Sequence, residues 1–215
     1  MTRVIIARHG QSEANANFIF AGHSDFPLTD FGREQARLIA EYLAKNEKID
    51  KIYSSDLKRA YGTALPTSEL LGIPIIKETG LREIYAGLWE AQPTDYIAEN
   101  FPDDFNCWRD NYSKVRCTGG ESIPEVYERI VPCICSIAKE NDGKTVFIAT
   151  HATVLRSFNA YAMGLKADET ANSPAALNAA LAIYTMDGER VIDSKFNITE
   201  HLGDMISRVP TKFNA

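Results

Sequence analysis

Two histidines of this sequence directly follow apolar runs, and each has an arginine close by. Arg8-His9-Gly10 comes after Val4-Ile5-Ile6-Ala7. His151 comes after residues 144–150, and Arg156 follows it. A neutral imidazole can attack an electrophile or carry a proton, and a guanidinium binds an anion through two parallel hydrogen bonds. These residue types therefore indicate chemistry on an anionic group such as phosphate.

The runs before both histidines are predicted to be buried strands, because a strand covered on both faces is apolar at consecutive positions. Ligands of open α/β sheets bind beyond the carboxyl ends of parallel strands, which share one edge. Either histidine alone is best interpreted as an ordinary strand-end residue. The pair at equivalent positions predicts that His9 and His151 face one pocket.

The rest of the chain alternates helical and strand patterns, with capping residues at several expected helix starts. The elements we expect are a helix from Thr29 or Asp30, a strand over 50–54, a helix capped by Ser55 or Asp56 that runs to Gly72 with a kink or break at Pro66, a strand over 73–76, a helix from Ser122 to about Asn141, a helix from about Ala152 to Met163, and a hairpin around Asp187-Gly188.

This alternation predicts an α/β fold, a three-layer αβα sandwich with a mainly parallel sheet. Residues 80–120 are rich in aromatic and acidic side chains and are expected to form a small cap insertion over the sheet edge. The length of 215 residues fits a single domain, residues 1–215. The tail after Ile198 is expected to be loosely held.

Composition narrows the classes of partner. The formal net charge of -6 disfavours nucleic acid and anionic membranes, but it permits a small phosphate ligand in a local arginine cluster. The sequence has no signal-peptide pattern and no apolar run of about 20 residues, so we expect a cytoplasmic protein with reduced thiols. The cysteines lack zinc-site spacing, and Cys133 and Cys135 are expected to be structural thiols on a helix. The sequence leaves the oligomeric state open.

Five segments, in this order, carry a resemblance to a known family. They are Arg8-His9-Gly10-Gln11-Ser12-Glu13-Ala14-Asn15, Gly22-His23-Ser24-Asp25-Phe26-Pro27-Leu28-Thr29, Ser54-Ser55-Asp56-Leu57-Lys58-Arg59-Ala60 with Thr63-Ala64, Leu81-Arg82-Glu83-Ile84-Tyr85-Ala86-Gly87-Leu88-Trp89-Glu90, and Thr150-His151 with Arg156. In these segments the chain resembles the histidine phosphatase superfamily, the phosphoglycerate mutase-like proteins, and within it the phosphatase branch.

The resemblance implies a nucleophile and an acid. His9 would attack phosphorus and become a phosphohistidine, which water then hydrolyses. Glu83 would give a proton to the leaving alkoxide and later take one from water. Its apolar and aromatic neighbours suit an acid that must hold a proton, and Glu90 is the less favoured rival for this role.

The resemblance also implies a phosphate pocket without metal or cofactor. Arg8, Arg59 and His151 would neutralise the phosphoryl oxygens, and Asn15 would add a neutral donor. Arg59 is expected just inside a helix start, where backbone N–H groups also favour an anion. Ala152 stands beside the pocket where the family most often has glycine, and its methyl group could narrow the site.

The predicted function is hydrolysis of a small phosphorylated metabolite by a metal-independent phosphomonoesterase. Phosphoglycerate mutase is the main alternative, but the short segment up to Gly120 favours a phosphatase. A non-catalytic phospho-ligand binding module is the second alternative. Gly119 to Ser122 is interpreted as a turn and helix cap, and His23 and His201 as surface histidines. The cap aromatics, which are Phe101, Phe105, Trp108 and Tyr112, could line the substrate or pack the cap.

Overall fold

The computed structural model describes residues 1–207 and contains a six-stranded sheet in the order β4-β3-β6-β1-β7-β8. The strands β1, β3, β4 and β6 are parallel to one another. Along one side of them, β7 pairs antiparallel with β1, and β8 pairs antiparallel with β7. The bounds of these strands are β1 (Thr2–Arg8), β3 (Lys51–Ser54), β4 (Ile75–Lys77), β6 (Thr145–Thr150), β7 (Leu181–Asp187) and β8 (Arg190–Ile198). The prediction of a mainly parallel sheet is confirmed.

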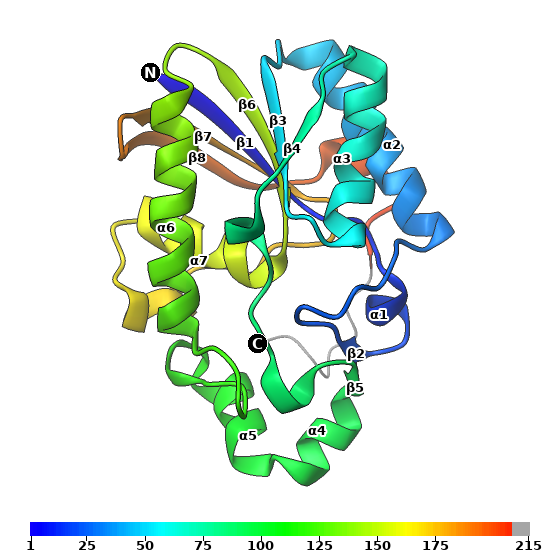
Figure 1. Ribbon diagram of the computed structural model, residues 1–215, viewed down its shortest axis with the longest axis vertical. Coiled ribbons are helices and arrows are strands. Elements are labelled where there is room, and N and C mark those ends of the chain that lie inside the picture. The colour runs from blue at the N-terminus through cyan, green and yellow to red at the C-terminus, as the bar shows by residue number, and fades with distance from the viewer. Residues whose placement is uncertain (208–215) are drawn as a thin grey trace.

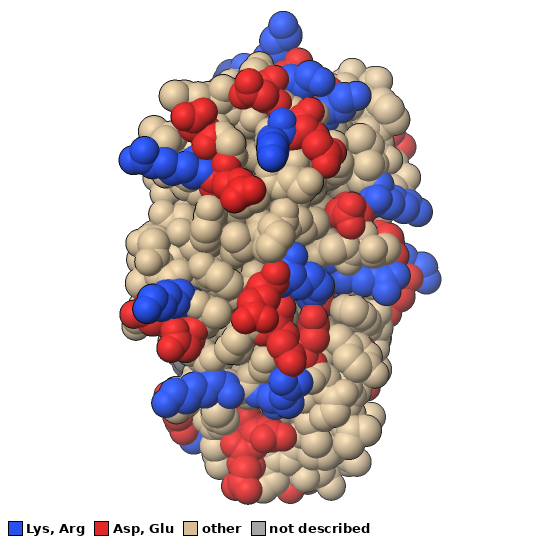
Figure 2. All heavy atoms as spheres, turned by 60° about the vertical axis from the view of Figure 1, so that its left-hand side comes forward, with Lys and Arg blue, Asp and Glu red and all other residues tan. Residues whose placement is uncertain are grey.

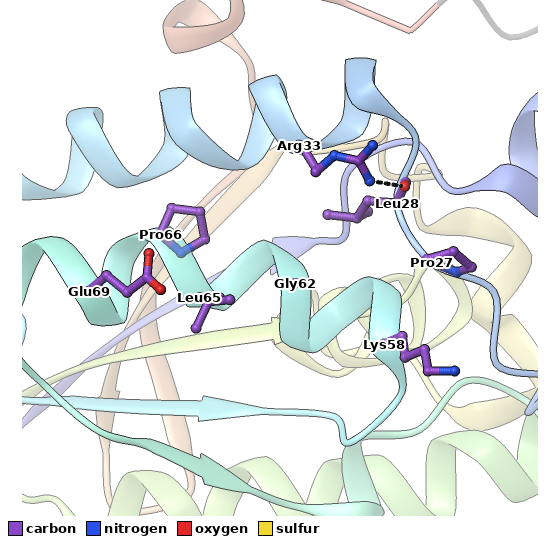
Figure 3. Close-up of a pocket in the computed structure, with 8 residues that line it drawn as sticks. All are labelled: Pro27, Leu28, Arg33, Lys58, Gly62, Leu65, Pro66 and Glu69. Carbon is purple, nitrogen blue, oxygen red and sulfur yellow. Dashed lines mark hydrogen bonds between the residues drawn. The ribbon is translucent and has the colours of Figure 1, made fainter.

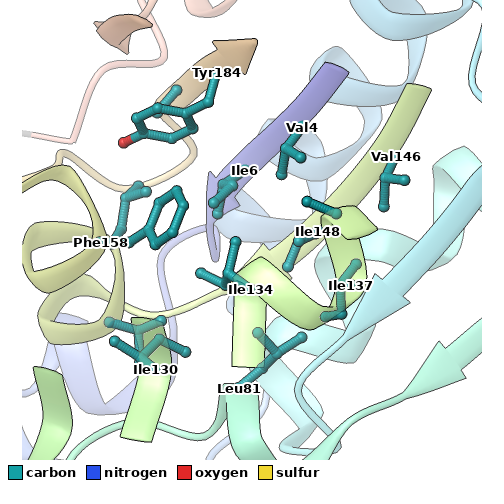
Figure 4. Close-up of a cluster of buried hydrophobic side chains, with 14 of the residues drawn as sticks. Val4, Ile6, Leu81, Ile130, Ile134, Ile137, Val146, Ile148, Phe158 and Tyr184 are labelled. Atoms are coloured by element: carbon teal, nitrogen blue, oxygen red, sulfur yellow. The ribbon is translucent and has the colours of Figure 1, made fainter. Parts of the chain in front are cut away.

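Helices cover both faces of this sheet (Figure 1). The helices α2 (Asp30–Asn46) and α3 (Lys58–Leu71) pack on one face, where Ile5 and Phe147 lie in their apolar cluster. The helices α6 (Ile123–Glu140) and α7 (Ala152–Ala162) pack on the other face, against a cluster that includes Val4, Ile6 and Ile148 (Figure 4). Successive side chains of a strand point to opposite faces, so each continuous apolar run serves both layers. The three-layer αβα architecture is confirmed.

Two details of α3 differ from the prediction. Its N-cap is Leu57, whose side chain makes no capping hydrogen bond, rather than Ser55 or Asp56. The helix also continues through Pro66 without a break. An interior proline removes one hydrogen bond and crowds the carbonyl four residues earlier. Buried residues on both sides of it, Ala64 and Thr67, hold α3 on the body of the protein and offset this cost. The helix starts at Thr29 and Ser122 are confirmed, each with a side-chain cap.

Residues 80–120, the cap segment, form short elements that Figure 1 shows below the sheet in that view. These elements are the end of η1 (Thr79–Leu81), then η2 (Gly87–Trp89), β5 (Gln92–Pro93), α4 (Thr94–Asn100), α5 (Pro102–Asp110) and η3 (Tyr112–Lys114). β5 pairs with β2 (Ile19–Phe20), and a third apolar cluster forms around buried Trp89. Trp108 contacts Trp89 and Tyr112 edge to face, so these aromatic side chains pack the cap segment together.

The remaining elements are α1 (Glu13–Ala16), η4 (Ala167–Asn172) and η5 (Glu200–Leu202). The prediction of a loosely held tail is wrong for residues 199–207. Leu202 is buried in the cluster beneath α2, and the Gln35 side chain donates a hydrogen bond of 2.7 Å to the Met205 carbonyl. The part of that prediction that concerns residues 208–215 lies outside the described residues.

The surface carries mixed charge on the face that Figure 2 displays, where acidic and basic side chains alternate. Within residues 1–207, no helix is long and apolar enough to cross a membrane. All four cysteines are free thiols, and Cys133 and Cys135 lie on α6 as expected. Partial burial raises the pKa of the Cys133 thiol to about 11.

Candidate active site

The carboxyl ends of β1 and β6 bring the two predicted histidines together. The backbone N–H of His9 donates a hydrogen bond of 2.8 Å to the Thr150 carbonyl, which ties the ends of the two strands to each other. The ring centroids of His9 and His151 lie 5.3 Å apart, and both residues are buried. The two imidazoles therefore lie side by side, as the sequence analysis expects; that they face one pocket stays a prediction.

The environment of His9 leaves one of its ring nitrogens available. Nδ1 donates a hydrogen bond of 2.7 Å to the carbonyl of Gly10, so the lone pair of the neutral ring lies on Nε2. Burial lowers the pKa of His9 well below its usual value, and the positive charges of Arg59 and Arg8 lower it further. His9 is thus a neutral imidazole with a free basic nitrogen, which is the form needed for nucleophilic attack.

Gly10 is required by close packing. A Cβ atom there would lie 2.5 Å from the carbonyl oxygen of Gly32 at the start of α2. The Gly10 N–H also donates to the Thr63 hydroxyl on α3, at 3.1 Å. The His9 loop is therefore held between the first turn of α2 and the middle of α3, on the same face of the sheet.

Arg59 is the second residue of α3 and is 1% exposed. Its guanidinium donates to two backbone carbonyls, Ser24 at 2.9 Å and Gly22 at 2.6 Å. Burial lowers the pKa of Arg59, although the nearby carboxylates of Glu83, Asp25 and Glu90 act in the opposite direction. The loop that carries Gly22 and Ser24 thereby orients the cation.

Glu90 holds that loop, a role that sequence reasoning missed. Its carboxylate accepts hydrogen bonds from the backbone N–H groups of His23, Ser24 and Ala86 and from the Ser24 hydroxyl, at 2.6–2.9 Å. Four donors thus share the two oxygens of Glu90, whereas each oxygen of Glu83 accepts one hydrogen bond among the described residues. Glu90 therefore orients Arg59 indirectly and is a poor candidate for proton transfer.

The side chain of Arg8 makes a single hydrogen bond among the described residues, from Nη1 to the Ala176 carbonyl at 2.6 Å. Its Nε is buried and has no partner in that part of the chain. Burial lowers the pKa of Arg8 to about 10, although Glu83 acts to raise it. An arginine with unused donors beside His9 is suited to bind an anion.

Glu83 lies at the N-terminus of α7. Its Oε2 accepts a hydrogen bond of 3.4 Å from the backbone N–H of Thr153, the second residue of that helix, and Oε1 accepts from Ile84 N at 3.0 Å. The carbonyl of Glu83 accepts from the His23 ring at 2.8 Å and from Arg129 at 3.2 Å. The interpretation of His23 as a surface histidine did not anticipate this contact: the residue is half-buried, and its ring helps to hold the Glu83 segment.

His151 is the N-cap residue of α7, and its Nε2 lies 2.9 Å from the Ser55 hydroxyl. Burial lowers its pKa well below the usual value, and Arg59 lowers it further. Ala152 is the first residue of α7 and is half-buried. Arg156, by contrast, donates to the carbonyls of Ser173 and Ala171 and stacks on Tyr112, so it joins α7 to the cap segment instead.

The loop over residues 173–180 packs against the backbone of Arg8 and His9. Asn178 on this loop donates to the His9 carbonyl and to Asn15 Oδ1, both at 3.1 Å. The ring of His201, which is half-buried, donates to the Ala179 carbonyl at 3.0 Å, a contact that its interpretation as a surface histidine did not anticipate. No sequence signal indicated Asn178, since 169 residues separate it from His9.

A separate pocket lies between α2 and α3 and contains none of the residues predicted for the site (Figure 3). The residues that line it are Pro27, Leu28, Arg33, Lys58, Gly62, Leu65, Pro66 and Glu69. It holds neither of the two buried histidines nor Glu83, so the candidate active site is at the sheet edge.

Comparison with known proteins identifies the family of the chain. Residues 4–199 match the family model of the histidine phosphatase superfamily, branch 1. The chain is 34% identical over 204 residues to phosphoserine phosphatase 1 of Hydrogenobacter thermophilus, which covers 95% of this chain and 96% of the relative. It is 30% identical over 208 residues to a metal-independent phosphoserine phosphatase of Arabidopsis thaliana, covering 95% and 85%.

Solved structures show the same likeness. Bacillus stearothermophilus YhfR superposes with a TM-score of 0.88 at 28% identity, covering 94% of this chain and 100% of that one. A mycobacterial glucosyl-3-phosphoglycerate phosphatase superposes with a TM-score of 0.82 at 27% identity, covering 91% and 98%. The chain is therefore a histidine phosphatase, a member of branch 1 of that superfamily.

Proposed function

We propose that this protein is a metal-independent phosphomonoester hydrolase that works through a phosphohistidine at His9. The observation that carries the proposal is the state of this imidazole. It is neutral, its Nδ1 is engaged by the Gly10 carbonyl, and two arginines act on it electrostatically. The arginines would bind the phosphoryl oxygens and leave Nε2 to attack phosphorus.

The proposed reaction has two displacements. In the first, a bond forms from His9 Nε2 to phosphorus, the phosphorus–oxygen ester bond breaks, and Glu83 gives its proton to the leaving alkoxide. In the second, Glu83 takes a proton from water, the water oxygen attacks phosphorus, and the bond to Nε2 breaks. Inorganic phosphate leaves, and both side chains return to their starting states.

The remaining pocket residues would bind charge. Arg8, Arg59 and His151 would surround the phosphoryl group, with Asn15 as a neutral donor and Ala152 beside them at the start of α7. The proposal includes no metal and no cofactor. The whole chain, residues 1–215, would act as one cytoplasmic unit.

The substrate we propose first is phosphoserine, within the wider class of small phosphorylated metabolites. The support is that two relatives that match most of the chain are named phosphoserine phosphatases. A mycobacterial glucosyl-3-phosphoglycerate phosphatase has a similar structure, so a sugar-linked phosphoglycerate is the next compound to test.

The test is release of inorganic phosphate from phosphoserine, 3-phosphoglycerate and sugar phosphates by purified protein. We expect the His9→Ala variant to lose nearly all turnover. Wild-type protein quenched during turnover should carry phosphate that is labile in acid and stable in alkali, and His9→Ala should carry none. Formation of 2-phosphoglycerate with stimulation by a bisphosphate would show a mutase instead. Binding of phosphate without turnover or phosphoenzyme would show a binding module.

A further inference from the structure

The side-chain amide of Asn15 has one possible orientation. Its Oδ1 accepts three hydrogen bonds, from the backbone N–H of Ser12 at 3.1 Å, the Ser12 hydroxyl at 3.0 Å and the Asn178 side chain at 3.1 Å. The Ser12 hydroxyl hydrogen points toward Asn15 because its oxygen already accepts from the Asn15 backbone N–H. A flipped amide would place its NH₂ group against these donors, so the flip is unfavourable.

Asn178 itself is oriented by the backbone of the nucleophile. Its Nδ2 donates to the His9 carbonyl, and a carbonyl oxygen only accepts hydrogen bonds. The same NH₂ group therefore faces both the His9 carbonyl and Asn15 Oδ1. Asn178 is 4% exposed, so water does not compete for these bonds.

The backbone after Asn178 is strained in a way that suits this role. Ala179 has a φ of 59°, in the left-handed region that alanine rarely adopts, and it is fully buried. Its N–H donates to the carbonyls of Arg8 and His9, at 3.1 and 3.2 Å. Strain of this kind persists where the surrounding structure fixes it, and it is found most often at functional sites.

We infer that Asn178 is a positioning residue that fixes the orientation of the Asn15 side-chain amide for binding phosphate. Together with Ser12, it occupies Oδ1 and leaves the Asn15 NH₂ group as the donor toward the anion. That NH₂ group has no hydrogen bond within the described part of the chain, and Asn15 is half-exposed. The inference rests on the proposed function, which assigns Asn15 to phosphate binding. It makes the His9 carbonyl, Asn178 and Asn15 one connected unit.

A double-mutant cycle measured by phosphate binding tests this inference. Isothermal titration of inorganic phosphate gives the dissociation constant for wild type, Asn178→Ala, Asn15→Ala and the double variant. We expect Asn178→Ala alone to weaken binding by about tenfold, the scale of one hydrogen bond to a charged group. In the Asn15→Ala background it should add less than about twofold.

The matched control is Asn197→Gly, which removes another side-chain tie of the same loop, the bond from Leu177 N to Asn197 Oδ1. Glycine accepts the positive φ of Asn197, so this variant tests loop anchoring alone. We expect phosphate binding within about twofold of wild type. Equal weakening by Asn197→Gly and Asn178→Ala would overturn the inference, because any loosening of the loop would then suffice.

If the effects of Asn178→Ala and Asn15→Ala on phosphate binding simply add, the inference is also overturned. In that case, turnover and phosphoenzyme formation by the wild type would leave the proposed function intact. Wild-type protein that neither binds phosphate nor turns over substrate would refute both the inference and the proposed function. If Asn178→Ala does not fold, side-chain amide signals of the wild type supply the answer. The Asn15 NH₂ resonances should shift on addition of phosphate, and those of Asn178 should exchange slowly with solvent. An unshifted Asn15 signal at saturating phosphate would contradict the inference.

Discussion

The neutral state of the buried histidines should make stability depend on pH in a defined window. Burial holds the pKa values of His9 and His151 well below 6.5 in the folded protein, whereas the unfolded chain has ordinary histidines. Below about pH 6.5 the unfolded state therefore binds more protons than the folded state, and the free energy of unfolding falls as pH falls. Well above pH 6.5 this loss of stability is absent, because the two histidines are neutral in both the folded and the unfolded protein.

The magnitude follows from linkage. Between about pH 7.5 and about pH 5.5, one histidine that ionises only in the unfolded chain lowers the free energy of unfolding by about 1.4 kcal/mol. The two histidines together should lower it by about 2.7 kcal/mol. The perturbation is the pair His9→Asn and His151→Gln, which replaces each ring by a neutral side chain. Asparagine keeps a donor near Gly10 O, and glutamine keeps a polar atom near the Ser55 hydroxyl.

The assay is urea unfolding followed by fluorescence of the two tryptophans, at both pH values, for wild type, each single variant and the double variant. The wild type should lose about 2.7 kcal/mol more than the double variant over this interval, and each single variant should lie midway. Other titrating groups, including His201, are common to all four proteins and cancel. An equal pH dependence in wild type and double variant would refute the reasoning, since it would mean that these imidazoles take up protons in the folded protein.

Three further outcomes are expected. Glu83→Gln should slow the phosphorylation burst with an alkyl phosphate by about 10²–10⁴-fold and affect an aryl phosphate much less, since only the alkoxide needs a proton; equal losses would refute the assignment of Glu83 as the acid. Gly10→Ala should destabilise the protein by roughly 1–3 kcal/mol in the same urea titration, because its Cβ would lie 2.5 Å from Gly32 O. The control Gly62→Ala should cost far less, because its Cβ meets only a flexible side chain at 3.3 Å. Activity should survive EDTA, since the two pocket arginines supply the charge; loss with rescue by Mg²⁺ or Zn²⁺ would contradict this.

Several elements were predictable because their signals are local. The apolar runs at residues 4–7 and 144–150 identify strands covered on both faces, and the residues that follow them mark a site at the sheet edge. The capping box at Ser122 and Glu125 is likewise a signal within four residues. The start of α3 was misplaced because its N-cap, Leu57, makes no side-chain capping bond and so carries no local mark.

The orientation of the site depended on contacts between distant segments. Glu90 holds Ser24 across 66 residues, and Asn178 reaches the His9 carbonyl across 169. In the sequence, nothing distinguishes Glu90 or Asn178 from a surface residue of the same type. The roles of His23 and His201 were misjudged for the same reason. Their partners are backbone groups, which every residue carries, so no residue type marks them in advance.

The residue types that can do the chemistry, and the strands that end at them, follow from the sequence alone, because both are properties of short segments. Tertiary structure decided the pairing of the two imidazoles at 5.3 Å and the burial that keeps them neutral. It also decided which hydrogen bonds orient Arg59 and Asn15. The physical reason is that electrostatics and hydrogen bonding depend on distances of a few ångströms, and only the folded chain establishes those distances between residues far apart in sequence.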